Sequence, residues 1–92
     1  MADQSIIIRH QSAVGTSTAV NVDFGTAIQR LYVTAKTADV LIEPNGSANT
    51  DSFRIINGTT HAAFDLRGSN VRTVGLLGAG GTSDVTLMGV VA

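Results

Sequence analysis

The sequence predicts an all-β protein, namely a single small β-sandwich of about eight short antiparallel strands in a jelly-roll-like arrangement. Apolar and polar residues alternate in nearly every segment, as they do in half-buried strands. β-branched residues, which favour strands, are abundant, and Gly, Asn and Pro separate the segments as turn formers. No linker interrupts the 92 residues, so we expect one domain over residues 1–92.

Each expected strand follows from this alternation. In the stretch TAVNVDF, for example, Val22 and Phe24 face one way while Asn21 and Asp23 face the other. The stretch FGTAIQRL could be read as a short helix, but its Thr and its β-branched neighbours favour a strand. We therefore expect strands at about residues 4–10, 18–24, 28–35, 38–43, 52–56, 60–66, 70–77 and 83–91.

Turn signals stand between these strands. Pro44-Asn45-Gly46 begins the longest loop, which has the sequence PNGSANTD. Asn57-Gly58 lies between two short expected strands and suits a type I′ hairpin turn, because both residues tolerate a positive φ.

Composition excludes several classes of protein. Charged residues make up only 14% of the chain and the net charge is −1, so no basic stripe is present and we expect no nucleic-acid partner. The absence of cysteine rules out a disulfide framework, a thiolate metal site and a cysteine nucleophile. The start MADQSIIIRHQ lacks the features of a secretory signal, and no apolar run approaches a membrane span, so we expect no membrane partner.

The glycine-rich stretch GLLGAGGTSDV, over Gly75–Val85, partly matches a phosphate-binding loop. Gly75 and Gly80 have the required spacing, but Gly81 occupies the position of the essential lysine. Such a loop must also lead into a helix, whereas the residues that follow alternate like a strand. We therefore expect a turn between two strands, with glycines supplying the positive φ.

Candidates for catalysis or metal binding are weak. His10 and His61 lie far apart without a third ligand nearby, and the carboxylates are spread along the chain. One loop does collect side-chain oxygens in the manner of a calcium site, but it has few charges and no closing acidic residue. Its residues are Asn45, Asn49, Thr50 and Asp51. We therefore expect no enzyme, with no catalytic residue, no cofactor and no metal.

Two expected strands are apolar on both faces. The stretch SIIIR places Ile6 and Ile8 on one side and Ile7 on the other, and VTLMGVV has Met88 and Val90 opposite its other apolar residues. A two-layer sandwich buries only one face of each strand. The remaining face, which we assign to Ile7, Met88 and Val90, is either a subunit or partner interface or is covered by a loop, although scattered surface apolar residues are also normal.

From about residue 28 to residue 92 the chain continues strand by strand, with ADVLIEPNGSANTDSFRIINGTTHAAFDLRGSNVRTVGLLGAGGTSDVTLMGVVA as its last and longest part. In its short length, its succession of strands and its few charges, the chain resembles the small β-sandwich virion proteins of tailed bacteriophages, especially capsid decoration or cement proteins. The resemblance implies a structural protein that is assembled in the bacterial host cytoplasm and located in the virion. It also implies self-association, often as a trimer, and binding to the major capsid protein or another virion protein.

The resemblance implies that such a protein stabilises the head shell. Two alternatives remain open. One is a component of the phage tail or fibre, and the other is a free-standing β-sandwich module that binds a carbohydrate or a protein.

Overall fold

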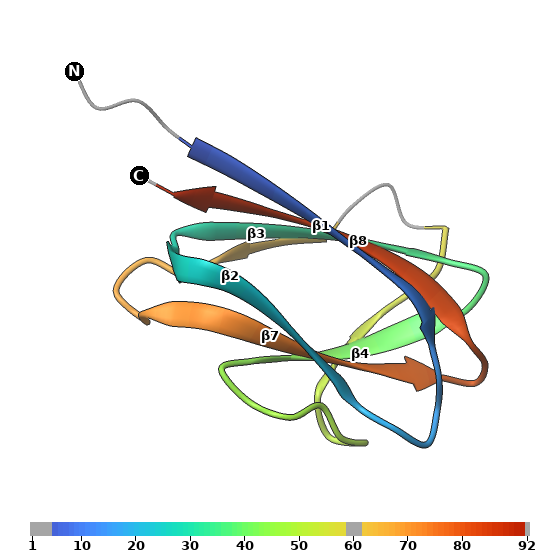
Figure 1. Ribbon diagram of the computed structural model, residues 1–92. Coiled ribbons are helices and arrows are strands. Elements are labelled where there is room, and N and C mark those ends of the chain that lie inside the picture. The colour runs from blue at the N-terminus through green and yellow to red at the C-terminus, as the bar shows by residue number, and fades with distance from the viewer. Residues whose placement is uncertain (1–4, 59–61, 92) are drawn as a thin grey trace.

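The computed structural model describes residues 5–58 and 62–91, which form eight strands in two four-stranded antiparallel sheets (Figure 1). The strands are β1 (Ser5–Val14), β2 (Val20–Ile28), β3 (Arg30–Lys36), β4 (Asp39–Pro44), β5 (Phe53–Ile55), β6 (Ala62–Asp65), β7 (Val71–Ala79) and β8 (Ser83–Val91). The described residues contain no helix that is both long and apolar enough to cross a membrane.

The strands pair symmetrically about the middle of the chain. β1 pairs with β8, β2 with β7, β3 with β6 and β4 with β5, all antiparallel. Two further pairings, β3 with β8 and β4 with β7, give the sheet orders β1-β8-β3-β6 and β2-β7-β4-β5. This is the strand order of a jelly roll, so the predicted fold class is confirmed.

Most of the expected strands lie where the alternation placed them, but two are longer. β1 continues to Val14 and β2 to Ile28, each through an irregularity in its pairing, between Gln11 and Val14 and between Asp23 and Ile28. The segment that could have been a helix forms the end of β2 and the start of β3. Residues 60 and 61 of one expected strand lie outside the described residues.

The expected type I′ hairpin at Asn57-Gly58 is wrong. β5 and β6, on either side of it, belong to different sheets, so no hairpin joins them. Only Gly58 has a positive φ, of 79°. Asn57 instead donates two hydrogen bonds of 2.9 Å, from its backbone N and its Nδ2, to Asp39 Oδ1 at the start of β4.

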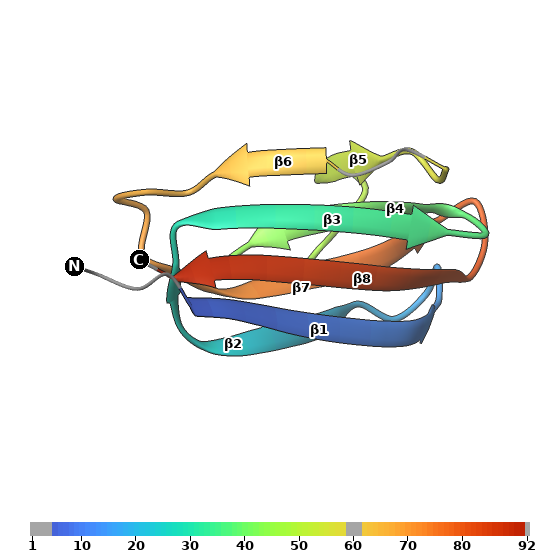
Figure 2. The same cartoon turned by 90° about the horizontal axis from the view of Figure 1, so that it is seen from above.

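The core lies between the two inner faces, and one glycine lets the sheets approach closely. A Cβ at Gly89 on β8 would lie 2.8 Å from Ile28 Cγ2 and 3.0 Å from Phe24 Cδ1, so β2 packs directly against the backbone of β8. The largest fully buried apolar side chains are Phe24, Ile28, Leu31, Ile42, Leu76, Leu87, Val14, Val33, Val40, Val74 and Val85. Seen from above, β1 and β2 lie along one side of the sandwich and β5 and β6 along the other (Figure 2).

Candidate functional site

The outer face of the β1-β8-β3-β6 sheet carries an apolar surface that no segment among residues 5–58 and 62–91 covers. Residues that pair across antiparallel strands point to the same face, so the pairings define rows across the sheet. One row reads Ile6, Val90, Arg30 and Asp65, and the next reads Ile8, Met88, Tyr32 and Ala63. We call this surface the apolar outer face, consisting of Ile6, Ile8, Tyr32, Ala63, Met88 and Val90. Ile6 is 58% exposed and Ile8 is 52% exposed.

The apolar outer face ends where the next row begins. This third row contains His10, Thr86 and Thr34, and Nδ1 of His10 lies 3.1 Å from Oγ1 of Thr86 in a hydrogen bond. One row further on, Asp84 pairs with Lys36 in register. The apolar residues are therefore confined to the half of the sheet that holds the start of β1 and the end of β8.

Charged groups border the apolar outer face on one side. Arg67 holds Asp65 in a two-pronged ion pair, with Nη2 at 2.7 Å from Oδ2 and Nε at 2.9 Å from Oδ1. The hydrogen bonds from the Arg67 side chain are the main cause that lowers the pKa of Asp65, and the same pairing raises the pKa of Arg67. Arg30 adds a smaller electrostatic effect on Asp65. Arg30 pairs with Asp65 in register but is not part of this ion pair.

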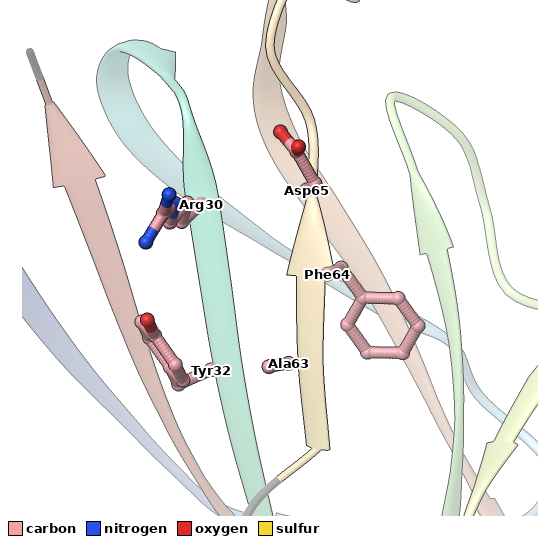
Figure 3. Close-up of a pocket in the computed structure, with 5 residues that line it drawn as sticks. All are labelled: Arg30, Tyr32, Ala63, Phe64 and Asp65. Carbon is pink, nitrogen blue, oxygen red and sulfur yellow. The ribbon is translucent and has the colours of Figure 1, made fainter.

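A shallow hollow lies beside these charges. It has a volume of about 290 Å³ and is lined by Arg30, Tyr32, Ala63, Phe64 and Asp65. Figure 3 shows Arg30 and Tyr32 projecting from β3 to the same side, while the Phe64 ring projects from β6 to the other side. The hollow therefore has an aromatic ring and a guanidinium among its lining groups.

The opposite outer face, on the β2-β7-β4-β5 sheet, is different in character. Asn21, Gly75 and Glu43 form one of its rows and Asp23 and Thr73 the next. On the other side of the Gly75 row, Leu77 and Leu41 form an apolar row with Arg54. The loop between β4 and β5 lies on this face, because a Cβ at Gly75 would come within 2.2 Å of the carbonyl oxygen of Gly46. The two outer faces thus differ among the described residues, since the first leaves Ile6 and Ile8 exposed while the second is partly covered by a loop and has its Leu41 only 7% exposed.

The glycine-rich stretch has a packing role. Gly78 N donates a 2.8 Å hydrogen bond to the Gly15 carbonyl, and a Cβ at Gly78 would lie 2.7 Å from the carbonyl oxygen of Val14. Gly80 has φ +82° in the turn between β7 and β8. Strand β8 follows in place of a helix, so the interpretation as a turn is confirmed.

Several side-chain oxygens of the loop that the sequence analysis compared with a calcium site form hydrogen bonds within the fold. Asn49 Oδ1 accepts from the backbone N of Asp51 at 2.8 Å, and Ser52 Oγ donates to Glu43 Oε1 at 2.9 Å. Asn45 Oδ1 accepts a 3.0 Å hydrogen bond from a backbone N of β7. Across residues 5–58 and 62–91, no three His, Cys, Asp or Glu side chains form a group that could hold a metal ion.

The expected interface residues fall on both faces of the sheet. Met88 and Val90 lie on the outer face, as the sequence predicts. Ile7, in contrast, packs against the core, and Ile6 and Ile8 are the exposed residues, so the assignment of faces in this run was wrong. In a run of three isoleucines, the sequence alone does not show which residues face the core. The pairings of Ile6 with Val90 and of Ile8 with Met88 place these two isoleucines on the outer face. His61 lies outside the described residues.

The fold defines the chain as a jelly-roll β-sandwich. No protein-family model matches the sequence, and no curated protein matches it either. Among solved structures, the chain is similar to the crystal structure of the SPBc2 prophage-derived protein YomS, with a TM-score of 0.57 and 18% sequence identity. The similarity covers 97% of this chain and 94% of that protein, so the whole sandwich is shared.

Proposed function

We propose that the chain is a structural protein of a tailed-bacteriophage virion, of the capsid decoration type, which stabilises the head shell. The similarity to a prophage-derived protein over nearly the whole of both chains supports a phage origin. The succession of short strands with few charges, in which the sequence resembles capsid decoration proteins, supports the assignment to the decoration type. The partners on this proposal are the major capsid protein or another virion protein, and further copies of the chain itself.

The observation that carries the proposal is the contrast between the two outer faces. Ile6 and Ile8 are more than half exposed on one face, next to Met88 and Val90, and no described segment covers them. Burying a large aliphatic side chain fully contributes about 1.5–3 kcal/mol, which an isolated sandwich leaves unrealised at this face. Apolar surface of this kind is typical of a contact with another protein.

Binding to the virion is the direct test. Tagged protein should sediment with purified virions of the encoding phage from which the native copy has been removed, and it should label their heads. Met88→Asp should abolish sedimentation, because it places a charge in the centre of the apolar outer face. Ile56→Asp is the matched control, since Ile56 is 54% exposed but lies away from this face, after β5. Normal sedimentation of the Met88 variant, or none for the wild type, would refute the proposal.

The hollow beside Tyr32 favours a second candidate, a module that binds a carbohydrate or another small polar ligand. Its lining combines aromatic side chains with a few polar groups, which is the general composition of small-ligand sites. A titration of acidic and neutral oligosaccharides followed by NMR would separate the two functions. Shifts confined to Arg30, Tyr32 and Ala63, and lost in Tyr32→Ala, would favour the ligand-binding module.

A further inference from the structure

The edges of the two sheets differ in how well they are protected against pairing with another strand. Exposed edges present unpaired backbone groups, and natural proteins block them with short strands, bulges or charges. Within the described residues, β5 has three residues and β6 has four, so both edges are short. β2 is interrupted between Asp23 and Ile28, where Gly25 has φ +79° and its N donates to Asp23 Oδ1 at 2.7 Å.

The first half of β1 has one of these protections, the charge of Arg9, which pairs with the buried Leu87 and donates a 3.4 Å hydrogen bond from Nε to the carbonyl oxygen of Asp23 on β2. It is neither short nor interrupted by a bulge. From Ser5 to Gln11 it pairs with β8 in unbroken register, and its irregularity comes only after Gln11. This stretch contains no proline, and Arg9 is its one acidic or basic residue besides His10. Its free edge is therefore long and regular, and the exposed Ile6 and Ile8 lie directly along it.

We infer that β1 pairs antiparallel with β1 of a second copy, about a two-fold axis near Ile7, and so joins two four-stranded sheets into one continuous sheet. The inference deepens the assembly role proposed above and rests on it for its biological meaning. A two-fold contact makes the basic unit a dimer, in place of the trimer that the resemblance implies.

The sequence of β1 is complementary to itself in this register. Ile6 lies opposite Ile8 of the second copy and Ile8 lies opposite its Ile6, so four isoleucines meet on the outer face. Arg9 lies opposite Ser5, which keeps the two guanidinium groups apart. An axis at Arg9 would instead bring like charges face to face, which destabilises a strand pair. This self-complementarity favours a second copy over an unrelated strand.

The paired strands would also extend the apolar outer face. Met88 and Val90 lie beside Ile8 and Ile6 within one copy. In the dimer these residues of both copies form one strip across the centre of the joined sheet. Such a strip offers a larger contact to a virion surface than either copy alone.

Single cysteines test the geometry directly, because the natural chain contains none. Ser5, Ile6, Ile7, Ile8 and Arg9 are each replaced by Cys, and dilute protein is oxidised and examined on a non-reducing gel. Crosslinked dimer should peak at Ile7→Cys, closest to the axis, and should be at background in Ile56→Cys. Equal crosslinking at all positions, or none above the Ile56 control, would overturn the inference.

Light scattering after size exclusion gives the second readout. Wild-type protein should have twice the 9.5 kDa mass of one chain, and Ile8→Lys should weaken the dimer by about tenfold or more. Ile56→Lys, with nearly the same exposure, should remain dimeric. A wild-type mass of one chain would reject the inference even if the protein sediments with virions. A dimer that fails to bind virions would reject the proposed function alone.

Discussion

Gly89→Ala tests the closest contact between the two sheets. The added Cβ would lie 2.8 Å from Ile28 Cγ2 and 3.0 Å from the Phe24 ring, and both partners are 2% exposed. Neither side chain can move into solvent, so the backbones must separate. Overpacking of this kind costs about 1–3 kcal/mol, while the stiffer unfolded chain offsets about 0.4–1 kcal/mol. We expect a net loss of about 1–2 kcal/mol in the free energy of unfolding.

Urea unfolding followed by far-UV circular dichroism measures this loss. The midpoint should fall with an unchanged slope, and the melting temperature should drop by about 4–8 °C per kcal/mol. All variants are compared at one protein concentration, because self-association stabilises by mass action. Gly15→Ala is the control, since a Cβ there meets nothing within 4 Å. A Gly89→Ala midpoint equal to that of the wild type would refute the close-packing argument.

Two further substitutions test polar contacts. Hydrogen bonds from the backbone N of Asn57, and then from Arg54, lower the pKa of Asp39. This contribution to stability is therefore present above the unfolded pKa of about 3.9 and is lost as the pH falls. Asp39→Asn should destabilise the protein at pH 7 and flatten its acid unfolding curve, and an equally steep curve would contradict the assignment. Ser83 is fully buried, with Oγ 2.7 Å from the carbonyl oxygens of both Lys36 and Ala38. Ser83→Ala should cost about 1–3 kcal/mol in urea unfolding, whereas the exposed Ser12→Ala should change it by less than about 0.5 kcal/mol.

Local pattern was enough to predict the strands because the two-residue period is a property of each segment by itself. Val22 and Phe24 alternate with Asn21 and Asp23 whatever they pack against, and the structure buries the first pair and exposes the second. The additional length of β1 and β2 could not be read in this way. A bulge shifts the alternation by inserting residues, so a strand that continues through one no longer shows a simple period.

Features that depend on a contact with a residue far along the chain could not be predicted from the sequence either. Asn57-Gly58 has the composition of a hairpin turn, but its conformation follows from β5 and β6 lying in different sheets and from the hydrogen bonds to Asp39. Gly75 similarly shows no local signal for the loop that lies over it, because Gly46 is far away along the chain.

The candidate site shows the same division. Met88 and Val90 alone were enough to predict that β8 is apolar on its second face, which the core does not use. The residues of β1 that lie on the same face could not be predicted, because Ile6, Ile7 and Ile8 are chemically identical and only the pairing with β8 orients them. Once oriented, Ile7 belongs to the core, and the exposed pair lies on the same face as Met88 and Val90. The apolar outer face is therefore continuous from β8 to the free edge of β1, and a second strand added at that edge would extend it rather than bury it.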